Sequence, residues 1–481
     1  MRVPIHPLAA FARLATFAPL AAFAPVTALL VLAPLARAAQ LEKVTEERVR
    51  AAYAEARAVL ESDFDARFHG ELTIRLVTSV ELGRRIAEEN LPIVRLRQPD
   101  EEKATAEAKA LGDAAGPIMF AKYAWSTREF LVVPKTWELS AKLLERPELT
   151  SDETLRAVMV HELVHAWDDA LHDLSAFIAN ADSVDAANAV NAIIEGHAQY
   201  TTRRVCAAHG WSKGFDTFTS GIGVIPESSK ASGEGMMTLL RAQSANTTFA
   251  YHDGESFVTA IGNVGGPEAL ARAFRDPPRD GETILHPEWF LDPRTRPVML
   301  YDPEPALDLF VARFPADVWT SQRLTVQSNQ LEAALVLLPK VDAAAIVASV
   351  RNARLVALYP AANPAEKMVV MTILEFGTEA EARAYVAMSD RLSKLKDEQM
   401  KSGVVRITGS TTSTLDGVDT FGFLQHKQMK NGVLAFDVLS LDLGRGKLVV
   451  ETLLSGEPLD IEPHVKLGIA LLEAVKKREA K

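Results

Sequence analysis

The stretch HELVHAWDD, His161 to Asp169, lies near the middle of a chain of 481 residues and places two histidines four positions apart. On an α-helix, residues four apart lie one turn above each other on the same face, so His161 and His165 can offer two imidazoles to one metal ion. Glu162 projects about 100° further round the helix, where its carboxylate can accept a proton from a water held by that metal. This HExxH pattern predicts a zinc site with a glutamate as general base.

The residues around the motif predict that it lies on a helix. Thr150 and Glu153 are three positions apart, as in a capping box, and residues 152–174 contain neither glycine nor proline. Residues 183–208 form a second predicted helix, interrupted only by Gly196. This second helix can turn back and pack against the first.

A third ligand is needed, because a catalytic zinc commonly takes three protein ligands and leaves a fourth position for water. Glu195 lies on the second predicted helix, and Gly196 beside it would let the two helices come close. His197 is the competing candidate, but two residues along a helix it faces well away from Glu195, so both cannot ligate easily. We therefore favour Glu195 as the third ligand and keep His197 as the alternative.

The segments before and after the motif predict an α+β protein. In the first part of the chain, helical or strand periodicity falls at residues 41–60 (helix), 72–79 (strand), 118–134 (two short strands joined near Ser126 and Thr127), 254–263 and 267–274 (helices). In the last part it falls at residues 368–376 (strand), 379–400 (helix), 404–454 (four strands) and 461–477 (helix). Asn431-Gly432 and residues 442–446 are predicted hairpin turns.

This organisation predicts two domains. Residues 39–315 would form an α+β domain that carries the motif, residues 316–345 a helical linker, and residues 346–481 a separate antiparallel α+β domain. The last domain contains no motif that indicates chemistry. Its His426 and His464 are isolated, so we expect them to be structural or surface residues.

The first 38 residues have the features of a secretory signal. Arg2 and Arg13 precede an uncharged run rich in Ala, Leu and Phe, which ends in the small-residue cleavage pattern Ala36-Arg37-Ala38. The run is long enough to serve instead as a membrane anchor, but its three prolines favour cleavage. We therefore expect an exported protein, periplasmic or secreted, with no stable membrane insertion after cleavage.

The charge and cysteine content exclude some partners and some stabilising devices. Removing residues 1–38 takes away three arginines and no acidic residue, which moves the formal net charge from -11 to -14. Such an acidic chain argues against a nucleic acid partner. Cys206 is the single cysteine and cannot form a disulfide within the chain, so we expect it to be a small buried apolar residue.

Four segments in order resemble the gluzincin branch of the zincin metallopeptidases, in which the third zinc ligand is a glutamate on a later helix. They resemble more narrowly a group of exported bacterial proteins with HELxHA, EGxA, YxxGxxFV and ILHPE motifs; this chain has YHDGESFV at 251–258 and ILHPEWF at 284–290. The resemblance covers roughly residues 115–295. It implies a zincin-like metallopeptidase domain with His161, His165 and Glu195 as zinc ligands and Glu162 as general base.

The same resemblance suggests which group stabilises the oxyanion. Tyr251 matches the tyrosine of a Tyr-x-x-Gly stretch that hydrogen-bonds the tetrahedral oxyanion in the aminopeptidase branch of the gluzincins. His286 in ILHPE is the rival, because thermolysin-like enzymes use a histidine for this purpose. A third possibility is that Tyr251 only packs at the start of its helix.

Two departures from the family pattern limit what the resemblance implies. The Gly-x-Met-Glu-Asn segment that recognises a free amino terminus in the aminopeptidases is absent, so exopeptidase action is not implied. Thermolysin-like enzymes carry an aspartate four residues after the ligand glutamate, where this chain has Gln199. The group that orients the first histidine therefore stays open among Asp168, Asp169 and His172.

Taken together, these features predict an exported zinc peptidase that hydrolyses bonds in a peptide or protein substrate. The strand pair at 118–134 would offer an edge strand to the substrate backbone, or else be plain structural sheet. The alternative function is a zincin-fold binding or scaffolding protein with little or no peptidase activity. The presence of Glu162 favours the peptidase, because a structural metal site needs no general base.

Overall fold

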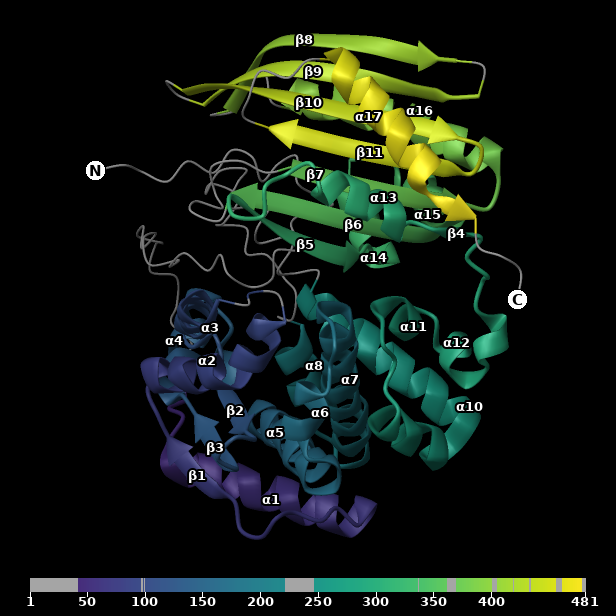
Figure 1. The fold of residues 1–481 in the computed structure, drawn as a ribbon. Helices are drawn as coiled ribbons and strands as arrows, with labels where there is room; N and C mark the ends of the chain where they lie inside the picture. The colour runs from purple at the N-terminus through teal and green to yellow at the C-terminus, as the bar shows by residue number, and fades with distance from the viewer. Residues whose placement is uncertain are drawn as a thin grey trace. The chain divides into compact units, whose positions relative to one another are not determined.

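The computed structural model describes residues 42–220 and 246–477, apart from 97, 99, 336, 361–368, 400–404, 418, 432–433 and 456–460. The chain divides into two compact units, and the division falls between Pro293 and Arg294 (Figure 1). The predicted signal sequence and Gly432 of one predicted turn lie outside the described residues. Within the described ranges, no helix has both the length and the apolar character needed to cross a membrane.

The first unit contains one small sheet and many helices. Its three strands, in the order β1-β3-β2, are β1 (Thr73–Leu76), β2 (Ala121–Ala124) and β3 (Glu129–Val132). β1 pairs parallel to β3, and β2 pairs antiparallel to it as an edge strand. The β2–β3 pair was predicted within residues 118–134, and Arg128 in its turn has a positive φ of 55°.

Helices pack on both faces of this sheet, α1 and α5 on one and α2 on the other. The helices of this unit are α1 (Glu46–Phe64), α2 (Ser79–Arg95), α3 (Glu101–Ala115), α4 (Pro134–Leu143), α5 (Asp152–His172), α6 (Leu174–Ala179), α7 (Val184–Ala208), α8 (Ser212–Thr219), α10 (Gly254–Arg275), α11 (Gly281–Leu285) and α12 (Pro287–Leu291), with the short turns η2 (Pro147–Thr150), η4 (Phe249–Asp253) and η5 (Pro293–Thr295). Gly266, with a φ of 64°, interrupts α10 between the two helices predicted there.

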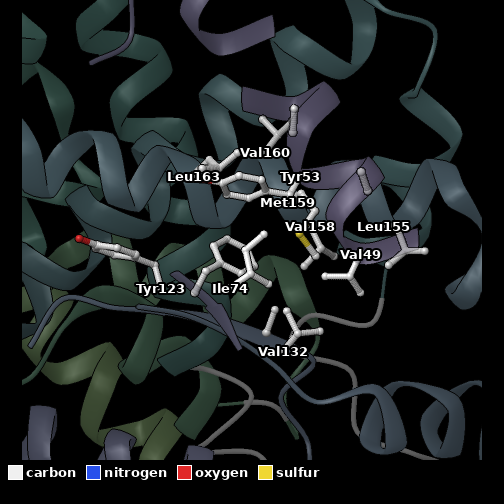
Figure 2. Close-up of a cluster of buried hydrophobic side chains, with 14 of the residues drawn as sticks. Val49, Tyr53, Ile74, Tyr123, Val132, Leu155, Val158, Met159, Val160 and Leu163 are labelled. Carbon is white, nitrogen blue, oxygen red and sulfur yellow. The ribbon is translucent and has the colours of Figure 1, made fainter. Parts of the chain in front are cut away.

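The core of the first unit lies between α1, the small sheet and α5. Figure 2 shows side chains of all three converging, among them Val49, Ile74 and Met159, while the hydroxyl of Tyr123 points away from the cluster. α5 is buried on nearly every side, which explains its apolar sequence around the motif. Its N-cap is Ser151, whose side chain accepts from the backbone of Thr154, so the predicted cap at Thr150 is wrong by one residue.

The second unit is built on an antiparallel sheet of order β5-β6-β7-β11-β10-β9-β8. Its strands are β5 (Trp319–Thr325), β6 (Val350–Pro360), β7 (Val369–Phe376), β8 (Val405–Asp416), β9 (Phe421–Asn431), β10 (Leu434–Arg445) and β11 (Leu448–Ser455), with β4 (Tyr301–Asp302) and β12 (Lys476–Lys477) pairing separately. Its helices are α13 (Glu304–Val311), α14 (Ser328–Ala334), α15 (Lys340–Ser349), α16 (Glu379–Gln399) and α17 (Ile461–Ala474). The prediction of an α+β protein with a separate sheet domain is thus confirmed.

The two faces of this sheet carry different helices. α13 and α17 pack on one face through an apolar cluster that includes Leu441, Val450 and Leu471 (Figure 1). α16 covers the other face, where the hydroxyl of Tyr385 donates to Glu451 at 2.7 Å. The β10–β11 hairpin turns at Gly446, as predicted from residues 442–446.

The structure differs from the predicted domain boundaries. Residues 316–345 were expected to be a helical linker, but they include β5, which pairs antiparallel to β6 as an edge strand of the large sheet. The second unit therefore begins at Arg294 and not after residue 315. The sequence did not predict β5, because its buried positions include the polar Gln322 as well as Leu324. This weakens the alternation of apolar and polar residues that indicates a strand.

Candidate metal centre

Three side chains from two helices converge in the first unit. The Nε2 atoms of His161 and His165, one turn apart on α5, lie 3.2 Å from each other. Glu195 on α7 places its Oε2 atom 3.2 Å from His161 Nε2 and 3.5 Å from His165 Nε2. Among the described residues, these three form a group that could hold a metal ion.

The geometry of the three atoms fits a tetrahedral metal ion. Zinc binds imidazole nitrogen and carboxylate oxygen at about 2.0–2.2 Å, so two ligands of one tetrahedron lie about 3.3 Å apart. The three separations bracket this value. The set of two histidines and one glutamate is also a common protein ligand set of a zinc ion that keeps one position open.

The electrostatics of the group also favour a cation. Burial alone would raise the pKa of Glu195, but the neighbouring His165 and His161 hold it well below its usual range. Burial lowers the pKa of His165, yet the charge of Glu195 outweighs this and raises it. A partly buried carboxylate that keeps its charge, and draws positive charge to its neighbours, is suited to bind a metal ion.

Two glycines explain how α7 and the following segment are brought together. Gly196 was expected to let α7 approach α5, but it faces Gly254 at the start of α10 instead. A Cβ atom on Gly196 would lie 2.2 Å from the carbonyl carbon of Gly254, and one on Gly254 would lie 2.2 Å from the carbonyl oxygen of Ala192. Only glycine at both positions allows this close contact between α7 and the start of α10. The contact places Tyr251, three residues before Gly254, beside the metal ligands.

Tyr251 lies beside the three ligands. It belongs to the π-helical turn η4, a local irregularity that often occurs at functional sites. Its ring stacks on that of His161, with centroids 5.8 Å apart and planes 10° apart. Burial first, then the charges of Glu195 and Glu162 and a hydrogen bond to Glu195, raise the pKa of the Tyr251 phenol well above its usual value. The hydroxyl is therefore a neutral donor.

Glu162 lies between the ligands and the edge of the small sheet. Its carboxylate accepts a hydrogen bond from the backbone nitrogen of Tyr123 in β2, at 2.6 Å. The hydroxyl of Tyr123 donates to Asp169 on the same helix, at 2.8 Å. Burial and the hydrogen bond to Asp169 raise the pKa of the Tyr123 phenol. The sequence analysis did not identify Tyr123, because a tyrosine in a strand carries no signal of such a contact.

His286 makes its contacts elsewhere. Its Nδ1 atom lies 3.1 Å from Glu288 and its Nε2 atom 3.7 Å from Glu282, while its ring stacks on Trp289 with centroids 4.2 Å apart. The side chain is 39% exposed. Every contact that the structure gives this histidine is within its own segment, so the structure does not bring His286 into the group of ligands.

The remaining candidates have distinct positions behind the ligands. His197 is directed to Asp168, with its Nδ1 atom 3.0 Å from Oδ2, and is not part of the ligand group. Asp169 accepts hydrogen bonds from Tyr123 and from the backbone of Leu174. The ring of His172 stacks on Phe274, and Gln199 is buried with its Oε1 atom lacking a hydrogen bond.

Two further features were found only from the structure. The ring of Phe218, on α8, contacts His161 edge to face with centroids 5.3 Å apart. A pocket of about 350 Å³ lies at the β2–β3 turn, bounded by residues 125–128 and by Asp169, Asp173 and Ser175.

Cys206 is buried against Ala157 and Phe215, and burial raises the pKa of its thiol to about 12.

No protein-family model and no curated protein matches the chain. Among solved structures, the chain is similar to the crystal structure of a candidate hydrolase with a novel fold from Chloroflexus aurantiacus, at 16% sequence identity and a TM-score of 0.35. The match covers 52% of this chain and 90% of the other. This likeness is too low to transfer a fold or a function, so the centre is defined by its own geometry.

Proposed function

We propose that this chain is an exported zinc peptidase of the gluzincin type, with a zincin-like first unit, that hydrolyses peptide bonds in a peptide or protein substrate. The observation that carries the proposal is the placement of Glu162. Its carboxylate lies next to a ready set of three ligands and is held by the edge strand β2. A metal site with a purely structural role has no use for a carboxylate in this position.

His161, His165 and Glu195 would hold the zinc ion. When bound, zinc supplies a Lewis acid for the scissile carbonyl and lowers the pKa of the attacking water. Glu162 would accept a proton from the attacking water and return it to the leaving amine. The backbone nitrogen of Tyr123 donates to one oxygen of Glu162, and the other oxygen would take the proton.

Tyr251 is the better supported donor to the oxyanion. It stacks against a metal ligand, and its raised pKa keeps the proton on the phenol at neutral pH. A neutral donor placed in advance stabilises developing negative charge without rearranging. His286 remains the rival only if its segment moves, because its ring is engaged with Glu288 and Trp289.

The edge strand β2 would receive the substrate. Its partner β3 lies on one side only, and the backbone nitrogen of Tyr123 faces Glu162 on the other. A substrate added there as a further strand would be bound by its backbone with little side-chain selectivity. The pocket at residues 125–128 begins just past the end of β2, where it could take a side chain of the same substrate.

The proposal is tested by digesting a broad peptide library with the purified chain. We expect cleavage of internal peptide bonds, loss of cleavage after chelation, and its return when zinc is added back. A zinc-binding chain that cleaves no peptide in the library would favour the alternative, a binding or scaffolding protein. Sequencing the amino terminus of the exported protein would test cleavage after residue 38.

A further inference from the structure

A buried acid lies on the apolar face of α2. Glu89 is 4% exposed and follows the buried Leu82 and Ile86 at helical spacing, so a carboxylate occupies a position where a core residue would be expected. An acidic side chain is almost never fully buried unless it is paired, because burial removes it from water. The partners of Glu89 therefore indicate what its carboxylate does.

These partners lie on the β2–β3 hairpin. The Oε1 atom of Glu89 accepts from the backbone nitrogen of Ser126 at 3.0 Å and from the Ser126 hydroxyl at 2.9 Å. The Oε2 atom lies 2.9 Å from Nζ of Lys122, whose side chain is itself only 12% exposed. One carboxylate of α2 thus holds both the strand β2 and the turn that follows it.

Lys122 also contacts Trp125 at the end of β2. The ammonium nitrogen of Lys122 lies 3.7 Å from the centroid of the Trp125 ring, which is a close cation–π contact. Trp125 and Ser126 both line the pocket at the β2–β3 turn. Glu89 therefore holds two neighbouring residues of the pocket wall, Ser126 directly and Trp125 through Lys122.

The other face of β2 is held by separate contacts. Lys122 and Tyr123 are adjacent, so their side chains point to opposite faces of the strand. The hydroxyl of Tyr123 donates to Asp169 of α5 at 2.8 Å, and its backbone nitrogen donates to Glu162. A change at Glu89 should therefore loosen the turn and its pocket, while these contacts with α5 remain.

We propose that Glu89 is a positioning residue that holds the β2–β3 turn, and with it the pocket that binds one side chain of the peptide substrate. The inference rests on the proposed peptidase function. Glu89 acts on the hairpin and not on the reacting atoms, so it affects substrate binding more than the chemical step. Its effect depends on whether the substrate reaches the pocket.

The test is steady-state kinetics on one peptide that is cleaved in the library, and on the same peptide shortened one residue at a time. The shortening step at which the wild-type KM rises marks the loss of the residue that fills the pocket. Glu89→Gln keeps the shape of the side chain and an oxygen for Ser126, but it removes the charge that holds Lys122. We expect its KM for the full peptide to rise about tenfold and its kcat to stay within about threefold. Its KM for the shortened peptide should match that of the wild type.

Glu88→Gln is the matched control. Glu88 precedes Glu89 on α2, but its side chain is 42% exposed and its ion pairs are with Arg84 and Arg85 of the same helix. This variant should leave KM unchanged for both peptides. Zinc content should equal that of the wild type in both variants, which separates a shifted pocket from damage to the metal centre.

The melting temperature of each variant separates positioning from a general loss of fold. If Glu89→Gln does not fold, the double variant Glu89→Gln with Lys122→Met carries the test, because it leaves no buried charge unpaired. The same length-dependent rise in KM is expected. A KM that stays unchanged for the full peptide, or that rises equally for both peptides, would overturn the inference. A wild-type chain that cleaves no peptide would instead reject the proposed function, and the inference with it.

Discussion

The two units of this protein differ in whether buried polar side chains converge on one point. In the second unit several buried polar groups pair with a neighbour: Glu451 accepts from Tyr385, Lys427 contacts Asp397, and His464 lies 2.7 Å from Thr452. In the first unit three such groups face a common point. Within the part of the chain that the structure describes, the second unit has no comparable group of three metal-binding side chains.

This difference separates a site from a packed interior. Polar groups that pair with each other remove the cost of burial and leave nothing for a ligand to do. Polar groups that converge without neutralising each other keep that cost until a ligand offsets it. The contrast therefore directs attention to α5 and α7, although the second unit also contains buried acids and a buried lysine.

The largest expected effect is on hydrolysis in Glu162→Gln. This change keeps the shape of the side chain but removes the base that accepts the proton, so turnover should fall by at least about a thousandfold. Zinc content should not change, because Glu162 is not a ligand. The matched control is Glu451→Gln, a partly buried glutamate in the second unit, which should turn over peptides normally. Comparable losses of turnover in Glu162→Gln and Glu451→Gln would contradict the assignment of hydrolysis to the first unit.

The next effect concerns Tyr251→Phe, which removes one hydroxyl. We expect the turnover number to fall by about a hundredfold to a thousandfold, because one donor to the oxyanion is lost. KM, zinc content and melting temperature should stay nearly the same. His286→Ala is the comparison variant. If it loses turnover while Tyr251→Phe does not, the oxyanion role belongs to His286.

A smaller effect distinguishes the third ligand from its neighbour. Glu195→Gln should weaken zinc binding at least about tenfold, because an amide is a poorer zinc ligand than a carboxylate. His197→Ala should change zinc affinity by less than about threefold, since His197 is not one of the three ligands. Equilibrium dialysis against a zinc buffer measures both values. Equal zinc loss in the two variants would contradict the ligand assignment.

The last prediction concerns stability in the second unit and should leave the centre untouched. Burial lowers the pKa of His464 to about 4, so below its ordinary value near 6.5 the unfolded chain binds a proton that the folded chain does not. The stability from neutral His464 is complete above pH 6.5 and falls as the pH drops toward 4, by about 2 kcal/mol at pH 5. His464→Gln should lose this slope between pH 6.5 and 4 in denaturant unfolding. An unchanged slope would show that His464 is not buried in its neutral form.

Much of the centre could be predicted because it depends on local spacing. Two histidines four apart on a helix must share a face, and the order of the later motifs pointed to Glu195 and Tyr251. The contacts of Tyr123 with Glu162, of Gly196 with Gly254 and of Asp168 with His197 join distant segments. No spacing in the sequence encodes them, because they depend on how helices and sheet pack in three dimensions.

The fold shows the same limit. The strands β8 to β11 were predicted as four strands because they alternate and are separated by turn residues. β5 was not predicted, because the buried Gln322 interrupts its apolar pattern. For this reason the boundary between the two units was predicted too late in the chain. Helix ends are also set by single capping residues, and the cap of α5 was predicted one residue early, at Thr150 instead of Ser151.

The measurement that tests the account most directly is the metal content of the chain purified without chelator. Three preformed ligands of the right type predict about one zinc per chain, and loss of that zinc in His165→Ala. Asp397→Ala, which removes a carboxylate from a buried pair of the second unit, should keep the full zinc content. A wild-type chain without zinc, or one whose zinc survives His165→Ala, would contradict the central claim.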